Sequence, residues 1–335
     1  MTLAPGRSDP MTAPTTAPMP FVRPDVGAFL DYLNKLPGPR THEMEPAAAR
    51  QVMRAMRDVT DAPPGELAVV RDLSIPGPAG AIPARLFDAR ETRDAGPAVV
   101  FFHGGGWVIG DIDTYASFTA EMARQLDLPV ISVDYRLAPE APWPAAPDDA
   151  EAAARWVATS PPELGRAITG LVLSGDSAGG NLTVVTAAAL RDAPAAVPVI
   201  VQAPIYPATD ASRPYESFDA FADGYLLTRD AMTWFGRHYA ADPDHARFSP
   251  LVASVAGLPP AVIVTASLDP IRDQGRAYAA ALALAGVSVT FQEAVGNIHG
   301  FITLRRAIPS SRQDVAGYLR AVKSAVLAAE QPAAG

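Results

Sequence analysis

The chain has 335 residues, of which 49% are hydrophobic and 19% charged, so it is long enough for one large globular domain with insertions or for two modest ones. Its formal net charge of −9 argues against a nucleic acid or an anionic membrane surface as the main partner. The lack of cysteine excludes disulfides, a thiolate nucleophile and thiolate metal sites.

Residues 1–20 are rich in Pro, Thr and Ala, and they have neither the basic nor the apolar segment of a secretory signal. We therefore predict a disordered lead-in over residues 1–20 and a cytoplasmic protein. No run of the sequence approaches the roughly 20 consecutive apolar residues that span a bilayer, so a membrane partner is not expected.

Residues 21–60 have a helical pattern that Pro37, Gly38 and Pro39 interrupt, and Pro46 stands near the start of the second helical segment. We predict that this region is the N-terminal part of a helical cap. Two stretches of alternating polarity follow at 66–76 and 81–90, and the sequence GPAG between them predicts an antiparallel hairpin.

Strands and helices then alternate along the rest of the chain. Short β-branched runs separated by Ala-rich helical segments indicate a parallel sheet that is covered on both faces. With the hairpin, the sequence predicts an α/β fold with a mostly parallel eight-stranded sheet. The six further strands are expected at 98–102, 129–135, 170–175, 197–204, 261–267 and 287–295, and the helices at 113–127, 145–159, 178–191, 272–285 and about 311–329.

One connection, over residues 208–250, departs from this alternation. It is too long for a simple crossover and too apolar for a disordered loop. We predict that it is an insertion that completes the helical cap over the active face. The core of the fold is then expected to comprise residues 61–207 and 251–330.

Residues 171–180, LVLSGDSAGG, place a serine between a strand and a helix. Gly175, Ser177 and Gly179 form the G-x-S-x-G pattern of a nucleophile elbow in the strand–turn–helix context that this motif requires. The N–H of Ala178 is expected at the N-terminus of the helix, where the helix dipole favours negative charge. The pattern predicts Ser177 as the nucleophile of an acyl-transfer enzyme.

Three consecutive glycines follow the strand at 98–102, in the sequence FFHGGGW. Ordering glycine is entropically costly, so a run of three indicates that bare backbone is needed there. We predict an oxyanion hole made by the N–H groups of Gly105, Gly106 and Ala178, with Gly104 giving the turn its room. A phosphate-binding loop would require a Lys–Ser/Thr pair or a G-x-G-x-x-G pattern, and neither is present here.

A serine nucleophile needs a base and a carboxylate to orient it, which in this chain order follow the serine as Asp or Glu and then His. His299 is expected on the loop after the last strand, and Asp269 at the end of the preceding strand, with Asp273 as the competitor. His103 is expected to order the glycine loop, and Asp176 is also assigned a supporting role. No spacing of His and acidic residues suggests a metal site, and no cofactor is expected.

Taken in order, the motifs HGGGW, GDSAGG, LDP and HGF, together with DYRLAPE at 134–140, resemble those of the hormone-sensitive-lipase family of carboxylesterases, also called bacterial esterase family IV. The resemblance covers about residues 40 to 330 and implies the α/β-hydrolase fold. It implies the triad Ser177, Asp269 and His299, and the oxyanion donors Gly105, Gly106 and Ala178. It also implies a buried charge network of Asp134, Arg136 and Glu140.

The function expected is cofactor-free hydrolysis of short-chain or aryl carboxylic esters, small molecules that would bind beneath the cap. Two alternatives stay open: an amidase or formamidase that uses the same triad, and a non-catalytic ligand receptor on this fold. Candidate pocket residues, which could equally fill the core of the cap, are Trp107, Trp143, Phe218 and Tyr225. The resemblance also leaves a homodimer open.

Overall fold

The computed structural model describes residues 20–331, so the predicted lead-in over residues 1–20 lies outside the described residues except for its last position. Within the described part of the chain, no helix is both long and apolar enough to cross a membrane.

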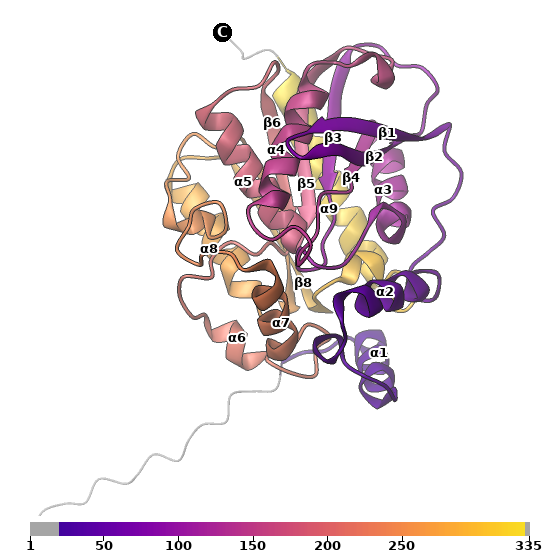
Figure 1. The fold of residues 1–335 in the computed structure, drawn as a ribbon, viewed down its shortest axis with the longest axis vertical. Helices are drawn as coiled ribbons and strands as arrows, with labels where there is room; N and C mark the ends of the chain where they lie inside the picture. The colour runs from indigo at the N-terminus through magenta and orange to yellow at the C-terminus, as the bar shows by residue number, and fades with distance from the viewer. Residues whose placement is uncertain (1–19, 332–335) are drawn as a thin grey trace, which may run out of the picture.

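A single eight-stranded sheet forms the centre of the molecule, in the order β1-β2-β4-β3-β5-β6-β7-β8 (Figure 1). The first two strands form the predicted antiparallel hairpin, β2 pairs antiparallel with β4, and all other pairs are parallel. The expectation of a mostly parallel eight-stranded sheet is confirmed. The strands are β1 Val69–Gly77, β2 Gly80–Asp88, β3 Gly96–Phe102, β4 Val130–Val133, β5 Ile168–Asp176, β6 Val199–Ile205, β7 Ala261–Leu268 and β8 Val289–Ile298.

Strand β3 shows why the sheet is buried on both faces. Successive side chains of a strand point to opposite faces, so a strand covered on both sides is apolar at every position. Val100 and Phe102 join the hydrophobic cluster on one face, whereas Val99 and Phe101 join the cluster on the other. Helices α4 Ala145–Ala158, α5 Ala178–Asp192 and α8 Arg272–Leu284 contribute to the first cluster, and α3 Ile112–Leu126 and α9 Ser311–Glu330 to the second.

The remaining helices come from the two segments expected to form the cap. Helices α1 Pro24–Lys35 and α2 Pro46–Thr60 precede the sheet, and α6 Glu216–Ala220 and α7 Arg229–Tyr239 lie between β6 and β7, within residues 208–250. All four lie at one end of the molecule, the lower end in Figure 1. Short 3₁₀ turns span Thr41–Glu43, Pro162–Leu164, Pro250–Val252 and Phe301–Thr303, and α7 packs against the first of them.

Candidate active site

The predicted site residues follow the carboxyl ends of four strands. His103 comes directly after β3, Ser177 after β5, Asp269 after β7 and His299 after β8. In an open α/β sheet, ligands bind beyond this edge because the loops there converge. Side chains that are up to 196 residues apart in sequence are thereby brought to one place.

Ser177 occupies a sharp turn between β5 and α5. Its φ of 55° and ψ of −114° define a backbone conformation that residues other than glycine rarely adopt. The two flanking glycines allow this turn, since a Cβ atom on Gly179 would collide with the carbonyl oxygen of Phe102, and one on Gly175 with the carbonyl of Gly179. The geometry is that of a nucleophile elbow.

Ser177, His299 and Asp269 form one chain of hydrogen-bonding groups. Ser177 Oγ lies 2.9 Å from His299 Nε2, and His299 Nδ1 lies 2.7 Å from Asp269 Oδ2. Asp269 is fully buried, and its second oxygen accepts a hydrogen bond of 2.9 Å from the Ile271 N–H. Asp273, the competing acid, instead bonds Arg272 and the Ser217 backbone. The structure therefore brings Asp269, not Asp273, to the imidazole.

The glycine loop after β3 needs glycine at two positions for backbone reasons. Gly105 and Gly106 have φ values of +108° and +59°, in the region that favours glycine. A Cβ atom on Gly105 would collide with the Ile109 carbonyl, and one on Gly106 with the Phe235 ring. Among the described residues, none accepts a hydrogen bond from the N–H of Gly105, Gly106 or Ala178, so these three donors are available to a ligand.

Asp176 joins the glycine loop to the elbow. Its carboxylate accepts a hydrogen bond of 2.7 Å from the Gly104 N–H, and it accepts two more from the Tyr115 and Tyr206 hydroxyls at 3.1 and 3.3 Å. Burial raises the pKa of Asp176 to about 6, although nearby His299 and these hydrogen bonds act in the opposite direction. The residue before Ser177 is therefore a buried carboxylate that holds the start of the loop.

We expect Asp176→Asn to change how stability depends on pH. The folded protein binds this proton more tightly than the unfolded chain does, because the pKa is about 6 rather than 3.8. The stability that the neutral carboxyl gives at low pH is thus lost as pH rises from about 4 to about 6. Urea unfolding should show the free energy of unfolding of the variant rising relative to wild type by on the order of 3 kcal/mol across this window. A difference that stays constant with pH would contradict the assignment.

His103 is buried beside the loop, as its expected ordering role requires. Its Nδ1 lies 2.7 Å from the Gly104 carbonyl oxygen, and its ring stacks on Tyr135 at a centroid distance of 4.4 Å. The Tyr135 hydroxyl in turn donates to the His103 carbonyl over 2.7 Å. These contacts fix the backbone of His103 and Gly104, which connects the end of β3 to Gly105.

The charge network implied for the DYRLAPE segment is wrong in its pairing. Arg136 pairs with Asp149 at 2.7 Å, and Glu140 pairs with Arg50 at 2.7 Å, while Asp134 lies 3.7 Å from the His103 ring. Strand β4 ends at Val133, and the chain then leaves the sheet, so the charged residues of the segment meet partners on different elements. Three separate pairs replace the single network, and Glu140 is 63% exposed rather than buried.

A cavity of about 540 Å³ opens beside Ser177. Of the four candidate pocket residues, Trp107 and Phe218 line it and the other two do not. Trp143 packs edge-on against His245 at 4.9 Å, and Tyr225 packs against Phe221 at 5.2 Å. Sequence reasoning missed most of the remaining lining, which includes Arg213, Tyr215, Leu227, Met232, Phe235, Phe248 and Gln274.

The spacing of residues on α7 could have pointed to part of this lining. Met232, Phe235 and Gly236 are three and four residues apart, the spacing that places side chains on one face of a helix. Gln274, in the first turn of α8, is a further lining residue. In the structure its side-chain oxygen accepts from the N–H groups of Thr209 and Asp210, which fixes the start of the insertion. Over residues 20–331 there is no group of three or more His, Asp or Glu side chains that could hold a metal ion.

Comparison with known proteins identifies the family. Residues 99–303 match the model of the alpha/beta hydrolase fold family. The chain is 43% identical to the carboxylic ester hydrolase LipN of Mycobacterium tuberculosis over 74% of this chain and 69% of LipN. It is 36% identical to the carboxylesterase NlhH of the same species over 94% and 99% of the two chains. The crystal structure of an esterase from Pyrobaculum calidifontis superposes with a TM-score of 0.83 at 34% identity, covering 91% of this chain and 99% of that one.

The chain therefore belongs to the α/β-hydrolase family. Within that family, the similarity to carboxylesterases confirms the resemblance to the hormone-sensitive-lipase group, and the protein is a carboxylic ester hydrolase.

Proposed function

We propose that the enzyme cleaves esters through an acyl-enzyme on Ser177. The observation that carries this proposal is the pair of contacts at His299, 2.9 Å to Ser177 Oγ and 2.7 Å to Asp269. His299 Nε2 takes the hydroxyl proton as Ser177 Oγ bonds to the ester carbonyl carbon. Asp269 accepts a hydrogen bond from His299 Nδ1, so that the tautomer is fixed and the imidazolium is stabilised.

The carbonyl oxygen becomes an oxyanion in this step. Gly105, Gly106 and Ala178 supply the N–H donors for it, and their lack of partners among the described residues supports this role. The imidazolium of His299 then gives its proton to the leaving alkoxide, and the C–O bond of the ester breaks. Water repeats the sequence on the acyl-enzyme, with His299 again as the base, and releases the carboxylic acid.

The cavity beside Ser177 favours short acyl chains or aryl groups. Its lining is mainly apolar, and Trp107 and Phe218 are our choice for residues that contact the substrate. A cavity of about 540 Å³ suits a compact ester rather than a long, extended chain.

A panel of chromogenic substrates tests this assignment. We expect p-nitrophenyl butyrate to be hydrolysed with a kcat/KM at least about 10-fold above that of p-nitrophenyl palmitate, because the longer chain overfills the cavity. The p-nitroanilide of butyric acid should react far more slowly than the matching ester. Equal rates on butyrate and palmitate would contradict the short-chain assignment, and faster cleavage of the anilide would make the enzyme an amidase.

A further inference from the structure

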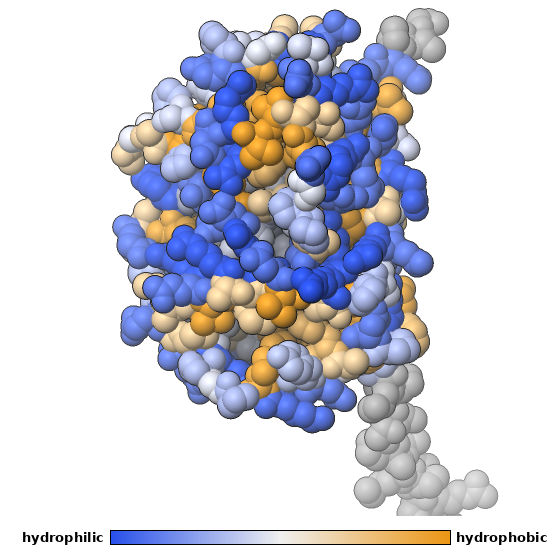
Figure 2. Space-filling model, turned by 90° about the vertical axis from the view of Figure 1, so that its right-hand side faces the viewer, coloured by the Kyte–Doolittle hydropathy of each residue, from blue (hydrophilic) through white to orange (hydrophobic). Residues whose placement is uncertain are grey.

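Helix α2 contacts the core mainly through charged side chains. Only Pro46 and Ala49 of its 15 residues are buried, and Met53 packs partly buried against the hydrophobic cluster that contains α3. A cleft beside it is lined by residues that include Arg54, Asp72, Arg85, Asp111 and Asp113. Figure 2 shows a band of hydrophilic residues across the middle of this side of the molecule. Polar contacts by the arginines of α2 therefore help to hold this helix on the core.

Arg50 makes the most extensive of these contacts. Its Nε donates to the Val108 carbonyl over 2.8 Å, and one Nη donates to the Ala138 carbonyl over 2.8 Å. Both Nη groups also donate to Glu140, at 2.8 and 2.7 Å. The hydrogen bonds from Arg50 lower the pKa of Glu140 to about 2, so this carboxylate is ionised near neutral pH. The Arg50 side chain is only 18% exposed.

The Val108 carbonyl, one of the two that Arg50 binds, is connected to an oxyanion donor through a single hydrogen bond. The peptide group that carries the Val108 carbonyl also carries the Ile109 N–H, which donates to the Gly105 carbonyl over 2.9 Å. The Gly105 carbonyl belongs to the same planar peptide as the Gly106 N–H. The direction of that N–H is therefore set by hydrogen bonds to the Gly105 oxygen.

A second path leads to the same oxygen. The Ala138 N–H donates to the Trp107 carbonyl over 2.9 Å, and the peptide of that carbonyl carries the Val108 N–H. This N–H also donates to the Gly105 carbonyl, over 3.1 Å. Arg50 thus holds the segment that contains Ala138 against the segment that contains Val108. Each of the two peptide groups that donate to the Gly105 carbonyl also accepts a hydrogen bond at its own carbonyl oxygen: Val108 from Arg50, and Trp107 from the Ala138 N–H.

We propose that Arg50 is a positioning residue for ester hydrolysis, which aims the Gly106 N–H at the oxyanion by clamping the Val108 and Ala138 carbonyls together. The proposal rests on the oxyanion role given above to the glycine loop. It makes α2 part of the machinery that stabilises the transition state, although the helix contributes no group that touches the substrate. An arginine suits this role because its planar guanidinium donates several hydrogen bonds in a fixed geometry.

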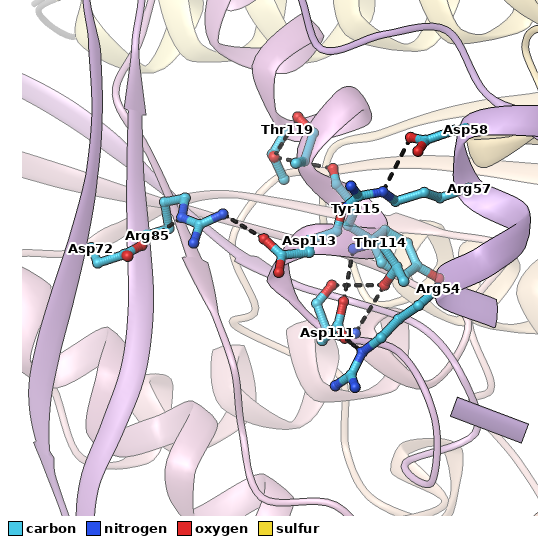
Figure 3. Close-up of polar contacts among 11 residues, drawn as sticks. Arg54, Arg57, Asp58, Asp72, Arg85, Asp111, Asp113, Thr114, Tyr115 and Thr119 are labelled. Atoms are coloured by element: carbon cyan, nitrogen blue, oxygen red, sulfur yellow. Dashed lines mark hydrogen bonds and ion pairs between the residues drawn. The ribbon is translucent and has the colours of Figure 1, made fainter. Parts of the chain in front are cut away.

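The same helix offers a matched control. Arg57 lies two turns after Arg50. Its Nε donates to Asp58 over 3.1 Å (Figure 3), and one Nη donates to the Asp113 carbonyl in the first turn of α3 over 3.4 Å. Arg54 is less suitable, because it pairs with Asp111, whose carboxylate caps the start of α3 at the end of the loop (Figure 3). Arg57→Ala therefore removes an arginine from α2 and leaves the hydrogen bonds of Arg50 to Val108 and Ala138 intact.

The test compares kcat, KM and the inhibition constant of a trifluoromethyl ketone, which forms a tetrahedral oxyanion adduct with an active-site serine. For Arg50→Ala we expect kcat on p-nitrophenyl butyrate to fall about 10- to 100-fold, less than for loss of a donor outright. KM should stay within about threefold, and the inhibition constant should rise in proportion to the loss of kcat. Arg50→Lys should recover part of the activity, and Arg57→Ala should match wild type.

Glu140→Gln keeps the proposal testable if Arg50→Ala does not fold. Its carboxylate is exposed, so the change weakens the hold on Arg50 with little effect on packing, and a smaller loss of the same kind is expected. Arg50→Ala that keeps kcat within about twofold, or that raises KM alone, would overturn the positioning role. A loss of kcat with an unchanged inhibition constant would overturn it too. Ser177→Ala in the same assay separates the proposals, since retained turnover there would refute the serine mechanism itself.

Discussion

Ser177→Ala reduces kcat on p-nitrophenyl butyrate by about 10⁴- to 10⁶-fold, because no other group can form the acyl-enzyme once Oγ is gone. The methyl group that remains keeps the elbow turn, so the melting temperature should stay close to that of wild type. Substrate binding should also change little, since the cavity beside the serine is unaltered. The measurement is kcat and KM by p-nitrophenolate release, with a thermal melt of each sample.

Covalent labelling with an organophosphate tests independently whether Ser177 Oγ is the nucleophile. Diethyl p-nitrophenyl phosphate should inactivate the wild type with one equivalent bound, and peptide mass spectrometry should find the adduct on Ser177. The alanine variant should bind none. Ser254→Ala is the matched control, because Ser254 is exposed, lies outside helices and strands, and its hydroxyl accepts a hydrogen bond from the Ala256 N–H. Labelling of any other residue, or turnover by Ser177→Ala at the wild-type rate, would show that a different nucleophile acts.

The strand pattern made much of the fold predictable. Strands buried on both faces, such as β3, are apolar at every position, and they alternate with Ala-rich helices that cover them. The positions of the three proposed triad residues could be predicted from the same pattern, because Ser177, Asp269 and His299 each come directly after a strand. Parallel strands end at one edge of a sheet, so three sequence positions far apart could be expected to meet there.

Side-chain pairing in the loops was not predictable in this way. Arg136 and Glu140 are four residues apart, yet one pairs with α4 and the other with α2, because the chain has left the sheet and turns between them. The role of Arg50 depends on the same turn, and nothing in the local sequence of α2 distinguishes it from Arg54 or Arg57. Such contacts depend on how segments pack in three dimensions rather than on the period of one segment.

The pocket was only partly predictable for a related reason. For the aromatic residues of the 208–250 segment, the sequence left the pocket and the core of the cap as equal alternatives, and the structure has examples of both. Phe218 lines the cavity, whereas Tyr225 packs on Phe221 in a small hydrophobic cluster with α1 residues. Composition alone assigns both to a partly buried, amphipathic region, and only the relative placement of α6, α7 and α1 separates them.

Gly106→Ala should strongly reduce the activity of the enzyme. The added methyl group would overlap the Phe235 ring of α7, and the φ of +59° is unfavourable for alanine. Either effect turns the peptide that carries the Gly106 N–H, so we expect kcat to fall by about 10²- to 10³-fold, as for loss of one oxyanion donor. Steady-state kinetics with p-nitrophenyl butyrate should show most of the loss in kcat rather than KM.

Two further variants separate the backbone cost from the steric one. Gly165 has a similar φ of +67° and no atom within 4 Å of an added Cβ. Gly165→Ala therefore introduces the left-handed backbone strain alone, and it should lower the free energy of unfolding without changing kcat. Phe235→Ala combined with Gly106→Ala removes the ring that the methyl group would strike. A double-mutant cycle should then show the pair to be less harmful than the sum of the single changes. Strict additivity would mean that Phe235 does not hold the loop, and full activity of Gly106→Ala would remove Gly106 from the oxyanion hole.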